Sequence, residues 1–243
     1  MSKKPVFIIS YNWLTYLKNI IKDILRMGGT PVILDNASTY PPLLDYLKEL
    51  EKDYLVYRSP HNLGPYGLLR NFNLVGTFYK EKTKEELPDP LVLTDPDLDL
   101  SAIPDDGLDK LFEAYISDKS GKYIKYGFSI EYRDIKGDSW RNIQSIQEQT
   151  RLQRIPDKLG DILGYNSSID TTFNLYAWKR ARGIRVCFGP AFRLKEPYTC
   201  RHLPYYWNAN ALKSEEIAYY LKNLKNLEQL GYSKTFVSNK VLQ

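Results

Sequence analysis

The chain is poor in the residues from which disulfide scaffolds and structural zinc sites are built. Among 243 residues it has two cysteines, Cys187 and Cys200, and two histidines, His61 and His202. Two isolated thiols exclude a disulfide framework and a Cys/His zinc site, so we expect a reducing, cytoplasmic compartment. No apolar run approaches the roughly 18 residues of a spanning helix, so we expect no transmembrane segment.

The chain also lacks a strong excess of either charge, but its two halves differ in sign. Residues 1–121 contain 14 basic and 18 acidic side chains, whereas residues 122–243 contain 20 and 11. A uniformly basic chain would favour a nucleic-acid partner, which we therefore do not expect. The opposite signs instead predict one cleft that holds a cation against the acidic half and a small anion against the basic half.

The apolar residues of the first 116 positions alternate between strand-like and helix-like spacing. Short apolar runs predict strands over 5–9, 31–34, 54–57 and 91–94, and helical spacing predicts helices over 14–25, 43–50, 68–79 and 108–116. This order is typical of a parallel sheet with crossover helices. Ligands of such sheets bind beyond the carboxyl ends of the strands, so the polar residues that follow each strand are candidate site residues.

The second half has a less regular pattern. It predicts a strand over about 123–130, a loop that enters a strand within 168–178, and an amphipathic helix over 214–230. The apolar face and lysines of that helix are compatible with peripheral contact to a membrane. No repeat or linker interrupts the chain, so we expect one domain over 1–243.

An acidic segment follows the strand predicted at 91–94. From Glu85 to Asp109 there are nine acidic residues and no Lys or Arg. Asp95 and Asp97 come directly after the strand, and paired carboxylates of this kind suit Mg²⁺ or Mn²⁺. A calcium-binding loop is disfavoured, because its sixth and twelfth positions would be Leu100 and Asp106 instead of Gly and Glu.

Four polar segments follow the predicted strands in a fixed order: Ser10-Tyr11-Asn12, Asp35-Asn36-Ala37-Ser38-Thr39, Asn62-Leu63-Gly64 through Leu69-Arg70-Asn71, and Thr94-Asp95-Pro96-Asp97. In this order they resemble the GT-A glycosyltransferases, in particular family 2-like enzymes and the small ones of bacterial polysaccharide clusters and large algal viruses. The last segment is similar to their DxD motif. The resemblance covers about the first 110 residues.

The resemblance implies an α/β fold of GT-A type, a Rossmann-like three-layer sandwich with a mixed, mainly parallel central sheet. It also implies an enzyme that uses Mn²⁺ or Mg²⁺ to move a sugar from a nucleotide-diphosphate sugar, most often a UDP-sugar, to a hydroxyl of a glycan or other acceptor. Residues 1–110 would bind the donor, and residues 111–243 would bind the acceptor and supply catalysis.

The resemblance further implies roles for single residues. Asp35 would hydrogen-bond the nucleobase, Asp97 would bind the metal directly, and Asp95 would contact ribose or a metal-bound water. Asp35 could instead cap the following helix. The residues implied to bind the donor or its metal are Ser10, Tyr11, Asn12, Asp35, Asn36, Gly64, Arg70, Asp95, Pro96 and Asp97.

Two residues of the second half complete the expected site. Asp170 lies in a segment that resembles the source of the catalytic acid in inverting members, where one carboxylate takes the proton of the acceptor hydroxyl. It could instead cap a helix that begins at Thr171. His202 stands where many GT-A enzymes bring a late His to the metal. It follows a basic stretch that we expect to face the diphosphate: Lys179, Arg180, Arg182, Arg185, Arg193, Lys195 and Arg201.

Two other functions stay open from the sequence. A nucleotidyltransferase can share such a sheet, but the segment after the first predicted strand, Ser10 to Trp13, lacks the usual Gly-rich phosphate loop. A non-catalytic module that binds sugar or nucleic acid would use the basic half and its tyrosines, and its binding would fall steeply with salt.

Overall fold

The computed structural model describes residues 4–64, 67, 72–135, 152–156, 160–169, 173–180, 189–208 and 210–223. Its helices are α1 (Thr15–Arg26), α2 (Pro41–Leu50), α4 (Phe72–Thr83), α5 (Gly107–Ser117) and α7 (Glu215–Lys222), with 3-10 turns η2 (Leu203–Tyr206) and η3 (Ala211–Lys213). Its strands are β1 (Lys4–Ser10), β2 (Gly29–Asp35), β3 (Leu55–Arg58), β4 (Leu91–Thr94), β5 (Leu98–Asp99), β6 (Lys125–Gly127), β7 (Ser129–Ile130), β8 (Leu152–Pro156), β9 (Asp161–Asn166), β10 (Asn174–Tyr176), β11 (Ala191–Leu194) and β12 (Thr199–His202).

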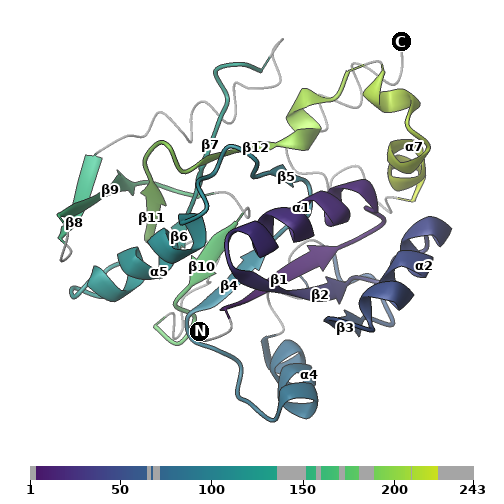
Figure 1. Ribbon diagram of the computed structural model, residues 1–243, viewed down its shortest axis with the longest axis horizontal. Helices are drawn as coiled ribbons and strands as arrows, with labels where there is room; N and C mark the ends of the chain where they lie inside the picture. Colours follow the sequence, from purple (N-terminus) through teal and green to yellow (C-terminus); the bar gives the residue numbers. More distant parts are fainter. Residues whose placement is uncertain are drawn as a thin grey trace.

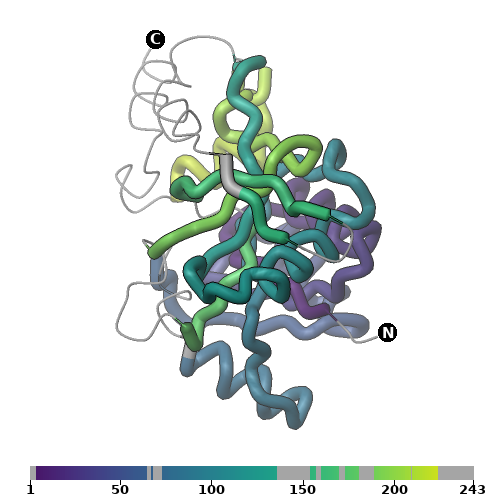
Figure 2. Tube along the Cα trace, turned by 90° about the vertical axis from the view of Figure 1, so that its left-hand side faces the viewer, coloured from purple at the N-terminus to yellow at the C-terminus, as the bar shows by residue number. Residues whose placement is uncertain are grey.

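The described strands form a nine-stranded sheet, in the order β3-β2-β1-β4-β10-β6-β11-β9-β8, and a three-stranded sheet, in the order β5-β12-β7 (Figure 1). Strands from both halves of the chain therefore share the large sheet. In the side view of Figure 2, α4 lies at one end of the molecule, and η3 and α7 lie at the other.

The apolar runs form buried strands because both faces of the sheet are covered. Along β1, Val6 and Ile8 join the core cluster that contains the buried residues of α1, α2 and α5, whereas Phe7 and Ile9 join the cluster on the α4 face. Successive side chains of a strand point to opposite faces, so a strand that is covered on both sides has to be apolar throughout. The result is an α/β fold with helices on both faces of one sheet.

The sheet is mixed, as expected. Four of its eight neighbouring strand pairs are parallel. Only β10 and β9 oppose the other seven strands, because each is antiparallel to both of its neighbours. The antiparallel strand β10 lies between β4 and β6, and its last residue pairs with the first residue of β4. It therefore carries the chain from the carboxyl edge of β4 back to the amino edge.

The strand predicted over 123–130 is divided, since β6 joins the large sheet and β7 joins the small one. The helix predicted over 68–79 is described from Phe72 and runs to Thr83, and the one predicted over 214–230 is described as α7, with residues 224–230 outside the described ranges. Within the described part of the chain, no helix combines the length and apolar character that crossing a membrane requires.

Candidate functional site

The polar segments that follow the first four strands meet at one edge of the large sheet. Ser10 pairs with Asp35, and Asp35 pairs with Arg58, so β1, β2 and β3 end level with one another. Thr94, the last residue of β4, pairs with Ile8, so Asp95 and Pro96 follow at the level of the end of β1. Because these strands are parallel, their carboxyl ends form the edge that the sequence predicted as the ligand-binding edge.

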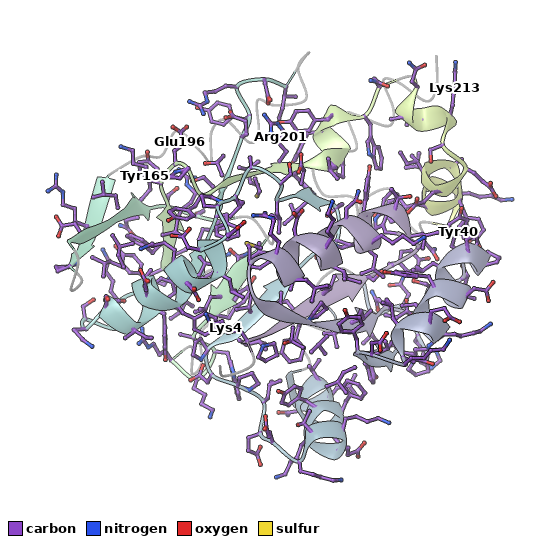
Figure 3. The ribbon with its side chains drawn as sticks, in the orientation of Figure 1. Lys4, Tyr40, Tyr165, Glu196, Arg201 and Lys213 are labelled. Atoms are coloured by element: carbon purple, nitrogen blue, oxygen red, sulfur yellow. The ribbon has the colours of Figure 1, made fainter. Side chains whose placement is uncertain are left out.

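Asp97 and His202 lie side by side at this edge. β12 pairs with β5 so that His202 stands opposite Leu98, and the N–H of Leu203 donates to the carbonyl of Asp97 at 2.9 Å. This pairing brings His202 Nε2 to 3.3 Å from Asp97 Oδ2. In Figure 3, Arg201, the neighbour of His202, lies far from Lys4, which marks the amino end of β1.

The donor atoms of this pair suit a hard divalent cation. Asp97 Oδ1 is buried and has no hydrogen-bond partner among the described residues. A buried carboxylate oxygen without a partner costs free energy, which a bound cation would offset. Mg²⁺ and Mn²⁺ bind one or two protein carboxylates and complete their shell with water and phosphate, and Mn²⁺ accepts imidazole. The described residues contain no group of three or more His, Cys, Asp or Glu side chains placed to hold a metal, so the remaining ligands would come from solvent or substrate.

Asp35 is held in a buried turn. Asp35 is 2% exposed, and its two carboxylate oxygens accept hydrogen bonds from the N–H of Ser38 at 3.4 and 3.3 Å. Burial raises the pKa of Asp35, while the bonds from Ser38 and the charge of Arg58 act in the opposite direction. Asp35 does not cap the next helix, which was the alternative role, because α2 begins only at Pro41.

Asn12 joins the loop after β1 to the loop after β2. Its N–H donates to Ser38 Oγ at 2.9 Å, and its Oδ1 accepts from the N–H groups of Thr39 and Tyr40 at 2.7 and 3.0 Å. Asn12 has φ 56°, a left-handed conformation that Asn tolerates better than most residues. Its predicted contact with the donor is therefore restricted to Nδ2, which is buried without a partner among the described residues.

Asn36 holds the loop after β3. Its Nδ2 donates to Asn62 Oδ1 at 3.2 Å and to the carbonyl of Gly64 at 3.1 Å, and its Oδ1 accepts from the N–H of Leu63 at 2.9 Å. Gly64 has φ 78°, and a Cβ built on it would meet no heavy atom within 4 Å. The positive φ explains the glycine, and the open space beside it allows a ligand to approach the backbone.

The C-terminal helix α7 covers this edge, which the sequence pattern did not predict. Tyr11 Oη donates to the carbonyl of Asn223 at 3.0 Å, and the Tyr220 ring stacks on Trp13 with centroids 4.1 Å apart. Glu216 accepts from the N–H groups of Leu14 and Thr15 at the start of α1. The helical pattern of residues 214–222 was visible in the sequence, but nothing in it indicated these partners.

Two tyrosine rings, those of Tyr16 and Tyr220, pack on Trp13 after β1, with centroids 4.7 and 4.1 Å from it. Burial, then the charges of Asp97 and Asp95, raise the pKa of Tyr220. The pKa of Tyr16 is raised to about 12, mainly by burial. The hydrogen bond from Trp207 acts in the opposite direction, and the charge of Asp97 adds to the rise. The rings from α1 and α7 therefore border the loop after β1, and the charge of Asp97 acts on both.

The described residues of the predicted basic wall do not lie together. Tyr176, at the end of β10, pairs with the first residue of β4. Lys179 and Arg180 therefore follow at the amino edge of the sheet, opposite the edge at which Asp95 and Asp97 lie. Arg193 is 1% exposed within β11, and burial lowers its pKa to about 10. Arg201 donates to Asp134 at 3.0 and 2.8 Å. The prediction that this stretch faces the diphosphate is wrong for Lys179 and Arg180, which follow β10 to the amino edge, and for Arg193, which is buried. It stays a prediction for Lys195, which follows the end of β11, and for Arg201, which pairs with Asp99. Arg182 and Arg185 lie outside the described ranges.

Asp170 and Arg70 lie outside the described residues, so their roles stay predictions. The described residues on either side of 170–172 are anchored to β6 and to the residue that follows it. Lys125 Nζ donates to the carbonyl of Ile169 at 2.6 Å, and the Phe173 ring stacks on Phe128 with centroids 5.0 Å apart.

Comparisons with known proteins leave the family open. No protein-family model matches the chain. A search of curated proteins finds no match either.

Proposed function

We propose that the protein is a metal-dependent glycosyltransferase that moves a sugar from a nucleotide-diphosphate sugar, most often a UDP-sugar, to a hydroxyl of a glycan or other acceptor. The observation that carries this proposal is the 3.3 Å approach of His202 Nε2 to Asp97 Oδ2. These residues were selected separately in the sequence, one after a strand and one near the end of the chain. Their meeting at the carboxyl edge is what a shared metal would require.

In this proposal, Asp35 accepts a hydrogen bond from an N–H of the nucleobase, and the loop around Gly64 lets the nucleotide approach the backbone. Asp97 and His202 would hold Mn²⁺ or Mg²⁺, with Asp95 as the neighbouring carboxylate. When bound there, the ion would supply Lewis-acid stabilisation of the negative charge on the departing nucleoside diphosphate. The donor enters against the loops that Asn12 and Asn36 fix.

The proposed chemical step inverts the anomeric carbon. Asp170 takes the proton of the acceptor hydroxyl as that oxygen attacks the anomeric carbon, and the bond from this carbon to the diphosphate oxygen breaks on the opposite side. The proton ends on Asp170, and the electron pair of the broken bond leaves with the nucleoside diphosphate. Asp170→Asn is expected to keep donor binding and lose transfer.

Thermal shift with a panel of nucleotide sugars tests the proposal. With Mn²⁺, one member is expected to raise the melting temperature, because a ligand that binds only the folded state stabilises it. Asp97→Asn should abolish this shift. Asp99→Asn is the matched control, since the Asp99 carboxylate lies two residues away and accepts from the N–H of Ser101 at 2.9 Å.

The product of slow donor hydrolysis separates the alternatives. A glycosyltransferase releases nucleoside diphosphate and free sugar, whereas a nucleotidyltransferase given a nucleoside triphosphate releases pyrophosphate. A thermal shift that is insensitive to chelator would contradict the metal part of the proposal. Salt-sensitive binding of nucleic acid without a response to any nucleotide sugar would contradict all of it.

A further inference from the structure

A hollow lies along the same edge of the large sheet. It has a volume of about 330 Å³ and is lined by the end of β11, the start of β9, the first turn of α5 and the segment before β12. β11 runs in the same direction as β4, so its last residue, Leu194, lies at the carboxyl edge. Glu196, which lines the hollow, and Arg201 lie on the same side of the molecule in Figure 3. We call this hollow the β9–β11 groove.

One short strand connects the groove to the site where Asp97 and His202 meet. Tyr198, in its wall, directly precedes the four-residue strand β12, and His202 ends that strand. Four extended residues span roughly 13 Å. The carbonyl of Tyr198 accepts from the N–H of Ser129 at 3.0 Å, which fixes this end of β12 to β7. A ligand in the groove therefore lies a short distance from the site where Asp97 and His202 meet.

The charges that line the groove cancel. Its walls carry two ammonium groups, Lys110 and Lys195, and two carboxylates, Asp161 and Glu196. Lys110 pairs with Glu113 at 2.5 Å, Asp161 pairs with Arg154 at 3.3 Å, and Glu196 pairs with Arg133 at 2.5 Å. Each ammonium has three donors and each carboxylate about four acceptor positions, so these pairs leave hydrogen-bonding capacity. Lys195 forms no ion pair with another residue of the described ranges.

Tyr198 adds a fixed aromatic surface to the wall. Its Oη donates to Asp106 Oδ2 at 3.1 Å, which holds the hydroxyl end of the ring on the α5 side. Tyrosine combines an apolar ring face with a polar end, a combination suited to ligands that have C–H faces and hydroxyl edges. Donors and acceptors without net charge, beside an aromatic ring, fit a neutral ligand rich in hydroxyl groups.

We propose that the β9–β11 groove binds a neutral, polyhydroxylated ligand, which we infer to be the glycan part of the acceptor. This inference rests on the proposed function, since it assigns the acceptor of that reaction to a place. An anionic glycan or a nucleotide fits less well, because Lys110, Asp161 and Glu196 are each held in an ion pair, and the Asp106 carboxylate beside Tyr198 offsets the charge of Lys195.

Binding of defined tetrasaccharides to the full chain tests the inference. The probes are maltotetraose, cellotetraose and chitotetraose, which are neutral, and tetragalacturonate, which is anionic, each measured by calorimetry and saturation-transfer NMR. At least one neutral probe is expected to bind, and Tyr198→Ala and Lys195→Met should each weaken it about tenfold, equivalent to roughly 1.4 kcal/mol. Tyr198→Phe, which keeps the ring, and Lys222→Met on α7 should retain the affinity.

A second arm separates this inference from the proposed function. Asp97→Asn should lose the Mn²⁺-dependent nucleotide shift and keep tetrasaccharide binding, and Tyr198→Ala should show the reverse. The inference is overturned if none of the probes binds, if tetragalacturonate binds best, or if neither groove variant changes the affinity. Any of these results can occur while the nucleotide shift persists, so the two failures are distinguishable.

Discussion

Glu216 accepts a hydrogen bond from the N–H of Thr15 at 2.9 Å, across 201 residues of sequence. Thr15 is the first residue of α1, and neither an acidic residue in the first turn nor a side-chain cap from the N-cap residue serves that helix end. A carboxylate there satisfies N–H groups that have no partner within the helix and interacts favourably with the helix dipole. The C-terminal helix α7 thus supplies the cap that α1 lacks, and it also covers the loop that carries Tyr11 and Asn12.

Removing this cap is expected to destabilise the fold and loosen α7. Glu216→Ala should cost about 1 kcal/mol, the usual value for a lost N-cap. For a chain of this size, that corresponds to roughly 2–4 °C in melting temperature. Thermal unfolding checks it, with the exposed neighbour Glu215→Ala as control. Equal melting temperatures for the two variants would show that the cap contributes nothing.

The buried carboxylate of Asp35 is expected to lower the free energy of unfolding at neutral pH while it serves nucleotide binding. Burial raises its pKa above the unfolded value, so its contribution to stability is fully present below the unfolded pKa and is lost as pH rises through the folded pKa. Asp35→Asn should therefore be more stable than the wild type at neutral pH, with the difference closing in acid. The same variant should lose nucleotide binding. Chemical unfolding at several pH values and nucleotide thermal shift measure the two effects; a variant that binds nucleotide normally would remove Asp35 from the site.

Gly127 is expected to tolerate no side chain. A Cβ there would collide with Asn174 Oδ1 and press on Ile169, the residue before the 170–172 segment. Gly127→Ala should cost roughly 1–3 kcal/mol, as overpacking does. Gly76→Ala in α4 is the control, because its Cβ would meet nothing nearer than Leu87 Cβ at 3.8 Å and alanine favours a helix. Denaturant unfolding compares them, and a neutral Gly127→Ala would contradict the packing described at β6.

Asp118 should make part of the stability sensitive to acid. Burial alone would raise its pKa, but bonds from Ser120, Tyr126 and the N–H of Tyr123, with the charge of Arg180, lower it below the ordinary value. A lowered folded pKa gives stability that is present above the unfolded pKa and lost as pH falls through the folded pKa. Asp118→Asn should cost roughly 1–3 kcal/mol at neutral pH and less in acid. Urea titrations across this range check it, and a pH-independent difference would refute the electrostatic part.

The sequence predicted the parts of the site that depend on local pattern. The apolar runs around Val6, Ile33 and Val92 identified the strands, and parallel pairing then brings the residues that follow them to one edge. The same reasoning could not place Arg180, since its position depends on β10 being antiparallel. β5 and β12 have two and four residues, too short for a periodic signal, yet their pairing is what brings His202 to Asp97.

The chain has two histidines, so NMR of their rings reports on the metal site with its own internal reference. His61 follows β3, which is separated from β4 by three strand spacings, roughly 14 Å. With nucleotide present, substoichiometric Mn²⁺ is expected to broaden the His202 ring signals while those of His61 persist, and Asp97→Asn should abolish the selectivity. His202 signals that survive Mn²⁺, or that broaden no earlier than those of His61, would contradict a metal held by Asp97 and His202.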